Sequence, residues 1–176
     1  LALMNLTEQM TVLGRQARAA SRELARLSSA ERNLCLLTMA TALEENGPGI
    51  LKANQKDMAA GKESGLDAAL LDRLKLDQTR IVAMARGLRE VAALPDPVGR
   101  ILDERVRPNG LKLQKVSSPI GVVVIIYESR PNVTADAAGL CVKSGNAVVL
   151  RGGSGAIDSN AQVPGVLAKA LEKGGA

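Results

Sequence analysis

The sequence contains no histidine, tryptophan or phenylalanine, and only one tyrosine and two cysteines among its 176 residues. Without histidine there is no Ser-His-Asp or Cys-His catalytic arrangement and no histidine-ligated metal. Two cysteines, Cys35 and Cys141, are too few for a cysteine-rich zinc site or a disulfide framework. Because Tyr127 is the only aromatic residue, the chain lacks a stacking platform for single-stranded nucleic acid. The composition favours a domain that binds a cofactor or a partner, and we expect no metal.

Long apolar runs and strongly basic blocks are missing as well. No run approaches the ~18 consecutive apolar residues of a membrane helix, so we expect no membrane partner. The net charge of +5 is spread along helices with acidic residues interleaved, which predicts a solvated surface and no nucleic-acid partner. The first residues lack a basic segment followed by an apolar one, and we therefore expect a cytoplasmic protein with reduced thiols.

Up to Pro95 the apolar residues recur at helical spacing. Ser28 and Glu31 have the spacing of a capping box, in which each side chain satisfies an amide of the first turn. Asn46-Gly47-Pro48-Gly49 is expected to end the helix that follows this box. The pattern predicts helices over residues 7–27, 28–45, 50–63, 66–74 and 78–93, the last capped by Asp77.

After Pro95-Asp96-Pro97 the period of the apolar residues falls from 3.6 to 2. Residues 100–107 and 111–116 alternate around Asn109-Gly110, which predicts a β-hairpin whose turn uses positive φ angles. Residues 120–126 are apolar on both faces, which is typical of a parallel strand buried between helices. A helix over 132–143, a second strand over 147–150 and a helix over 156–173 follow.

The predicted fold class is α/β: an N-terminal helical segment, a β-hairpin, and the start of a doubly wound parallel sheet. We divide the chain into a helical part over residues 1–99, a hairpin over 100–118, and a Rossmann-like βαβα part over 119–176. Ligands of such sheets bind beyond the carboxyl ends of the strands. The two strand-end loops, residues 127–131 and 151–155, are therefore the candidate site.

Each loop has a functional and a purely structural interpretation. Arg151 opens a glycine-rich loop before a helix whose first amides are expected to be free for an anion, although the loop also fits a plain turn. Arg130 is expected either to pair with Glu128 or to bind an anionic substrate. Asn132 and Ser129 either cap the following helix or donate to an oxyanion. Both cysteines are expected to be packing residues.

Two runs of sequence stand out. Residues 119–134 read Pro-Ile-Gly-Val-Val-Val-Ile-Ile-Tyr-Glu-Ser-Arg-Pro-Asn-Val-Thr, and residues 140–153 read Leu-Cys-Val-Lys-Ser-Gly-Asn-Ala-Val-Val-Leu-Arg-Gly-Gly. These runs closely resemble the gamma-glutamyl phosphate reductase family, also called glutamate-5-semialdehyde dehydrogenases, of the aldehyde dehydrogenase superfamily. Residues 65–74 and 94–99 are similar to the same family. The resemblance covers nearly the whole chain and implies an aldehyde dehydrogenase-like cofactor domain.

The resemblance implies NADPH-dependent reduction of L-glutamyl 5-phosphate to L-glutamate 5-semialdehyde in proline biosynthesis. A thiolate would displace the phosphate, and hydride would then reduce the thioester. By the same resemblance Arg151 lies where a 2′-phosphate is bound, and Ser129 lies where many relatives carry an oxyanion-stabilising Asn. Ser129 or Asn132 would then be the local donor, and Arg130 would bind substrate. The residues implied to line the cofactor are Ile125, Ile126, Tyr127, Glu128, Ser129, Arg151, Gly152, Gly153 and Ser154.

The family's catalytic cysteine lies farther along the chain in a separate catalytic domain, and neither cysteine here corresponds to it. We therefore expect an N-terminal portion that lacks the catalytic domain and is inactive alone. The hairpin of residues 100–117 would join copies of the chain into a homo-oligomer. The competing interpretation is a non-catalytic assembly module that keeps this hairpin. Gly155, where relatives tend to have Glu, weighs against the usual adenosine contacts, and Pro164 weighs against a continuous last helix.

Overall fold

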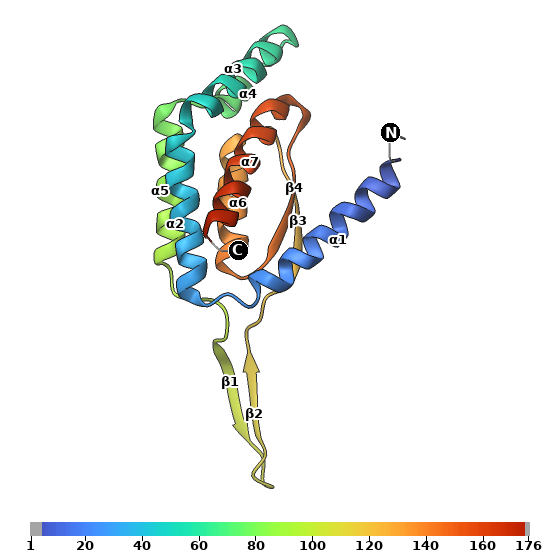
Figure 1. Ribbon diagram of the computed structural model, residues 1–176, viewed down its shortest axis with the longest axis vertical. Helices are drawn as coiled ribbons and strands as arrows, with labels where there is room; N and C mark the ends of the chain where they lie inside the picture. Colours follow the sequence, from blue (N-terminus) through green and yellow to red (C-terminus); the bar gives the residue numbers. More distant parts are fainter. Residues whose placement is uncertain (1–4, 175–176) are drawn as a thin grey trace.

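The computed structural model describes residues 5–174, so the outermost parts of the expected terminal domains, 1–4 and 175–176, lie outside it. Helices, a hairpin and a β-α-β-α unit follow one another in the predicted order (Figure 1). The elements are α1 (Leu6–Leu24), α2 (Ser29–Glu45), α3 (Gly47–Glu63), α4 (Ala68–Leu74), α5 (Gln78–Ala93), β1 (Ile101–Val106), β2 (Lys112–Val116), β3 (Val122–Ile126), α6 (Pro131–Lys143), β4 (Ala147–Arg151), the 3₁₀ turn η1 (Ser154–Ala156) and α7 (Ile157–Gly174).

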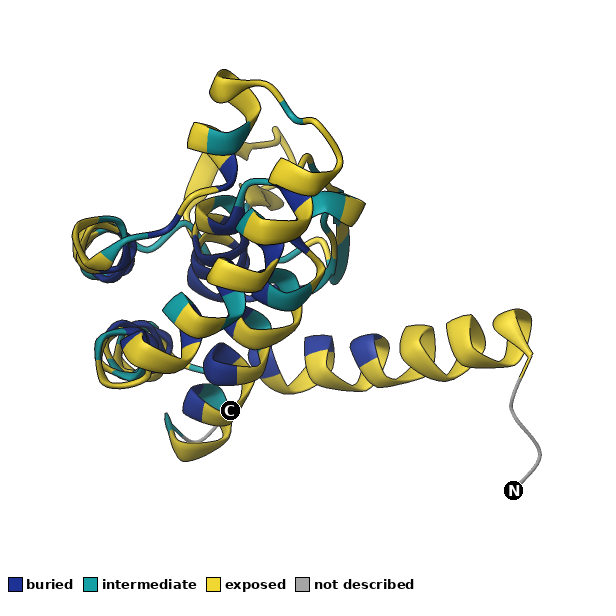
Figure 2. Ribbon diagram, turned by 90° about the horizontal axis from the view of Figure 1, so that it is seen from above, coloured by how far each residue is buried: buried dark blue, intermediate teal, exposed yellow. Residues whose placement is uncertain are grey.

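Helices α2, α5, α6 and α7 enclose the main apolar core. Figure 2 shows the buried residues concentrated where these helices face one another, whereas α1 extends away and is mostly exposed. The core of the described residues contains no large aromatic side chains, and its helices pack closely instead. At the contact of α5 with α6, a Cβ at Gly139 would lie 2.5 Å from Leu88 Cδ2. The largest fully buried aliphatic side chains are Leu36, Met39, Leu43, Ile50, Leu74, Ile81, Leu88 and Val163. The core is thus built from Leu, Ile, Val, Met and Ala, as the composition predicts.

The predicted helix starts are confirmed where a side chain caps the first turn. Ser28 Oγ accepts from Glu31 N at 3.3 Å, and Ser28 N donates to the Glu31 carboxylate at 2.6 Å. Asp77 caps α5 through its carboxylate. Helix α3 begins three residues earlier than predicted, at Gly47. Pro48 fits this first turn because an amide there has no intrahelical partner to lose.

Helix α7 continues through Pro164, so the predicted last helix forms although this proline weighed against it. Proline removes an amide donor and crowds the carbonyl four residues earlier. On the same helix, however, Val163, Val166 and Leu167 are buried in the core. Burial of this apolar face outweighs the local cost of the proline.

Strands β3 and β4 pair in parallel, with Ile126 opposite Arg151 at their carboxyl ends. The prediction that the first of these strands is buried on both faces is wrong. Val124 is 62% exposed and Ile126 is 79% exposed. Helices α1 and α6 provide the main helical contacts of these strands and leave both side chains uncovered. The two-stranded sheet therefore presents an apolar face to solvent.

The hairpin of β1 and β2 extends away from the body of the molecule (Figure 1), and every residue of both strands is exposed. Its turn differs from the prediction, because Gly110 alone has a positive φ, of 83°, while Asn109 does not. Arg107 N donates to Leu111 O at 2.9 Å. The connection is therefore a three-residue loop with glycine in the left-handed region.

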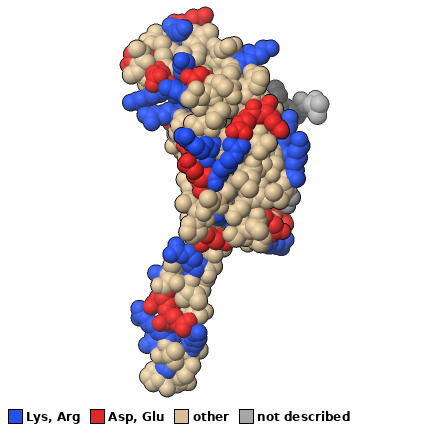
Figure 3. Space-filling view, turned by 90° about the vertical axis from the view of Figure 1, so that its left-hand side faces the viewer, with Lys and Arg blue, Asp and Glu red and all other residues tan. Residues whose placement is uncertain are grey.

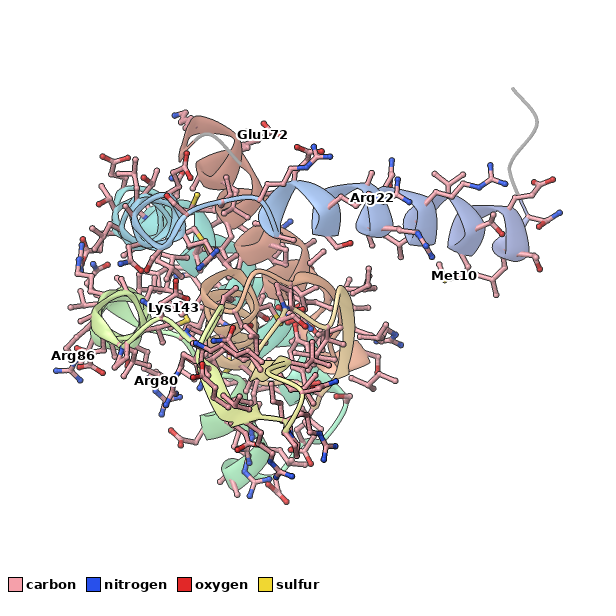
Figure 4. The ribbon with its side chains drawn as sticks, turned by 90° about the horizontal axis from the view of Figure 1, so that it is seen from below. Met10, Arg22, Arg80, Arg86, Lys143 and Glu172 are labelled. Atoms are coloured by element: carbon pink, nitrogen blue, oxygen red, sulfur yellow. The ribbon has the colours of Figure 1, made fainter. Side chains whose placement is uncertain are left out.

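A buried charged cluster connects the helical core to the base of the hairpin. Arg32 is 3% exposed and donates to the Asp96 carboxylate at 2.7 Å. Lys143 Nζ donates to Asn33 Oδ1 at 2.7 Å, and Figure 4 shows Lys143 between the helices. Burial lowers the pKa of Lys143. The Arg32–Asp96 ion pair holds the segment after α5, from which the hairpin starts, and Lys143 also donates to the carbonyl of Ala92 at the end of α5.

Charges of both signs are mixed on the outer surface. Figure 3 shows basic and acidic side chains together at the upper end of the molecule and along the hairpin. Within residues 5–174, no helix has the length and apolar character needed to cross a membrane.

Candidate functional site

The carboxyl ends of β3 and β4 lie side by side, and each strand continues into a polar loop. Tyr127 N donates to Arg151 O at 3.1 Å, which extends the pairing one step beyond β3. The loop of residues 127–130 and the glycine-rich loop of residues 152–155 therefore start at the same sheet edge. This edge is the position at which open α/β sheets bind ligands.

Ser129 connects the two loops. Its Oγ accepts from Gly155 N at 3.2 Å. A Cβ at Gly153 would lie 2.5 Å from Ser129 Oγ and 2.9 Å from Ser129 N, which leaves room only for glycine. Among the described residues, no acceptor takes the Ser129 hydroxyl proton. The contact thus fixes Ser129 while its hydroxyl remains able to donate.

The other loop glycine, Gly152, faces Asn160 of α7. A Cβ there would collide with the Asn160 side-chain amide. Asn160 Nδ2 donates to Gly153 O at 3.4 Å, whereas Asn160 Oδ1 is buried without a hydrogen bond. Arg151 is exposed, and its guanidinium donates to the carbonyl of Gly152. Among the described residues, the Arg151 guanidinium therefore has no carboxylate partner, and Asn160 Oδ1 has no hydrogen-bond donor.

The expectation of free amides at the start of the last helix is wrong for two of them. The Asp57 carboxylate, from α3, accepts from Asp158 N at 3.0 Å and from Ser159 N at 2.8 Å. The buried Asp57 side chain therefore already occupies the position at this helix N-terminus where an anion would bind. Asn54 reinforces the link, because its Nδ2 donates to Ser159 Oγ at 3.1 Å.

The start of α6 corrects the interpretation of Asn132. Arg130 is the N-cap residue and makes no side-chain cap bond, and Pro131 occupies the first turn. Asn132 lies inside the helix and is exposed, so it does not cap the helix. Tyr127 anchors the loop instead, with 2.6 Å between its hydroxyl and Thr134 Oγ1.

A cation missed by the sequence reasoning, Arg73 of α4, lies at this loop. Glu128 Oε2 is 3.6 Å from Arg130 Nε and 3.8 Å from Arg73 Nη1. Arg130 Nε is buried and makes no hydrogen bond. Arg73 is 55 residues away from Glu128 in the sequence and belongs to an ordinary amphipathic helix. Only the packing of α4 against α3 and its approach to the loop reveals the cluster, because no local pattern marks it.

Two clefts adjoin this Arg73–Glu128–Arg130 cluster. The first has a volume of about 600 Å³ and is also lined by Ser129, Ser154 and Asp158. The second has a volume of about 550 Å³ and is also lined by Arg80, Asn132 and Asp136. Arg73 and Arg130 line both clefts, so the two clefts adjoin at these two side chains.

Neither cysteine lies in an environment that would activate its thiol as a nucleophile. Cys35 is fully buried in the core, and Cys141 is buried on α6. Burial raises the pKa of both thiols, because a thiolate is poorly solvated there. The described residues hold no group of three or more His, Cys, Asp or Glu side chains that could bind a metal ion.

No family model matches the chain, but known proteins have similar sequences. The chain is 56% identical over 170 residues to the gamma-glutamyl phosphate reductase of Geotalea daltonii, and 55% identical over 173 residues to that of Moorella thermoacetica. These matches cover 97% and 98% of this chain. The chain resembles an N-terminal portion of gamma-glutamyl phosphate reductase. It spans 41% of the length of each of these two relatives.

Solved structures agree with the sequence comparison. The gamma-glutamyl phosphate reductase of Thermotoga maritima superposes with a TM-score of 0.88 at 40% identity, over 90% of this chain and 38% of that one. A probable aldehyde dehydrogenase from Listeria monocytogenes superposes with a TM-score of 0.69 at 17% identity, over 95% of this chain and 34% of that one. The second likeness concerns the fold alone. The chain therefore has an aldehyde dehydrogenase-like fold, as its motifs imply.

Proposed function

We propose that this chain is the cofactor-binding portion of an enzyme that reduces L-glutamyl 5-phosphate to L-glutamate 5-semialdehyde with NADPH. The observation that carries the proposal is the 56% identity to a gamma-glutamyl phosphate reductase across nearly the whole chain. The joined strand-end loops support it, because they lie where open α/β sheets bind ligands. The proposal includes a cytoplasmic location and a homo-oligomer formed through the hairpin of residues 100–117.

NADPH, when bound, supplies the hydride. Arg151 suits the 2′-phosphate because it is an exposed guanidinium with no carboxylate partner among the described residues. The buried, unpaired Asn160 Oδ1 gives the glycine-rich loop an acceptor for a ligand donor. These two features fit the cofactor. The residues that would line it are Ile125, Ile126, Tyr127, Glu128, Ser129, Arg151, Gly152, Gly153 and Ser154.

Ser129 is the favoured oxyanion donor. Its Oγ is held by Gly155 N while its proton is uncommitted among the described residues. A positioned donor of this kind stabilises the negative charge that develops on a carbonyl oxygen. Asn132 is exposed on α6 and is the second candidate, and Arg130 would bind the anionic substrate. Neither buried thiol is the nucleophile in this proposal, so the chain alone is expected to be inactive.

The alternative, an assembly module without cofactor, draws on one observation: both strands of the hairpin are wholly exposed. A cofactor titration separates the two functions. We expect calorimetry to detect saturable NADPH binding, and Arg151→Gln to weaken it about tenfold while leaving NADH binding unchanged. Arg107→Gln, which removes an exposed arginine at the hairpin, is the matched control.

No saturation at millimolar NADPH would favour the assembly module over the cofactor-binding portion. Equal weakening of NADPH and NADH by Arg151→Gln would contradict the assignment of Arg151 to the 2′-phosphate. Reductase activity from this chain alone would contradict the proposal that its nucleophile lies outside it.

A further inference from the structure

The second cleft contains charged groups that the fold does not use. Arg80 is fully engaged, since it donates to Asp72 Oδ1 at 2.8 Å and to Lys75 O at 2.7 Å. Lys75 Nζ lies 3.8 Å from the Asp77 carboxylate. These contacts tie the end of α4 to the start of α5, and they account for three of the charged side chains that line this cleft, Asp72, Lys75 and Arg80.

The remaining groups have weaker partners or none. Arg73 and Arg130 share the exposed Glu128 at 3.8 and 3.6 Å, and Arg130 Nε makes no hydrogen bond. Asp136 lines the cleft from α6 and forms no ion pair with any described residue. Partial burial raises the pKa of Asp136, so a neighbouring cation would stabilise its charged form.

Two guanidinium groups and an unpaired carboxylate in one cleft complement a ligand that carries both a negative and a positive group. We propose that this cleft binds the α-amino-acid end of the substrate, with Arg130 and Arg73 on the carboxylate and Asp136 on the ammonium group. Guanidinium groups match carboxylates in a bidentate geometry, and a carboxylate accepts from an ammonium group in a charge-assisted hydrogen bond. The cleft therefore recognises a zwitterion rather than a simple anion.

The assignment also orients the substrate. Arg73 and Arg130 line both clefts, whereas Ser129 lines the first and Asp136 the second. An amino acid held at Asp136 would extend its side chain past the arginines toward Ser129. The carbonyl that reacts would then lie at the hydroxyl that can stabilise its oxyanion. This inference rests on the proposed function, because it concerns the substrate of the same site.

Three small probes test the charge pattern on the 176-residue chain. L-Glutamate carries both α-groups, glutarate lacks the ammonium group, and 4-aminobutyrate lacks the α-carboxylate. We expect amide NMR shifts of residues 128–136 to report millimolar binding of L-glutamate, and at least fivefold weaker binding of each of the other two probes. Asp136→Asn is expected to weaken L-glutamate about tenfold and to leave glutarate unchanged.

The matched control is Glu90→Gln on α5, which pairs with Arg86 at 3.6 Å outside this cleft and is expected to change none of the three affinities. Equal binding of glutarate and L-glutamate, equal weakening of both by Asp136→Asn, or no binding of L-glutamate would each overturn the inference. The NADPH titration is a separate readout that Asp136→Asn is expected to leave unchanged. If the chain does not bind NADPH but still binds L-glutamate more tightly than glutarate through Asp136, the result counts against the proposed function and not against this inference.

Discussion

In the helical core, side chains such as Leu36 and Leu43 are completely buried, whereas every residue of the β1–β2 hairpin is exposed. Strand β3 is intermediate between the two: Val124 and Ile126 are exposed, and its other residues are half-buried. Among the described residues, the core helices α2, α5, α6 and α7 bury their apolar faces against one another, whereas the hairpin and one face of β3 remain uncovered. Apolar burial therefore stabilises mainly the core helices, and the hairpin and the outer face of β3 carry apolar side chains that no described residue covers.

Truncation of one leucine in each region gives the largest expected difference. Leu36→Ala in α2 is expected to lower the free energy of unfolding by about 3 kcal/mol, because it leaves a cavity in the closed core. Leu113→Ala on β2 is expected to change it by less than about 0.5 kcal/mol. Urea denaturation followed by circular dichroism measures both changes. If both variants lost the same free energy of unfolding, the hairpin would have to be packed against another surface in solution. The core and the hairpin would then not differ in burial.

The buried ion pair at the boundary of the two regions has an intermediate effect. Asp96→Asn leaves Arg32 buried without its counter-ion, and we expect a loss of about 2 kcal/mol. The matched variant Asp103→Asn removes an exposed pair with Arg105 at 2.8 Å on the hairpin, where we expect less than about 0.5 kcal/mol.

The Asp96 pair also has a signature in acid. Burial alone would raise the pKa of Asp96, but hydrogen bonds from Val98 N and Arg32 lower it below its usual value of 3.8. The unfolded chain then binds a proton more readily than the folded one in that range. The stabilisation is complete above pH 3.8 and is lost as the pH falls through the lower, folded-state pKa. Asp96→Asn is expected to flatten this part of the stability profile, and an unchanged profile would contradict the assignment.

The sequence was most informative where local chemistry decides the structure. The Ser28 capping box, the Asp77 cap and the order of helices and strands follow from neighbouring residues, and all are present. The prediction from sequence was wrong where contacts with residues distant in the sequence decide the structure. Asp57, about 100 residues before α7, closes the helix N-terminus that was expected to be free.

The candidate site divides in the same way. The strand-end loops were predictable because the carboxyl ends of parallel strands meet at one sheet edge, and Ser129 indeed contacts Gly155 there. Arg73 was not predictable, because it reaches Glu128 only through the packing of α4. The burial of β3 was overestimated for a related reason. Val and Ile on both faces of a strand indicate that both faces need apolar contacts, but the described residues cover only part of them.

The exposed face of β3 gives the smallest expected effect. Val124→Thr replaces a methyl group by a hydroxyl of similar size, and on an exposed face it is expected to change the free energy of unfolding by less than about 0.5 kcal/mol. Val163→Thr makes the same change in the fully buried face of α7, where a hydroxyl without a partner costs about 1–3 kcal/mol. Thermal unfolding at two protein concentrations measures both changes. A large loss for Val124→Thr that grows with protein concentration would mean that a second copy covers this face, so that the sheet, like the helices, is packed in solution.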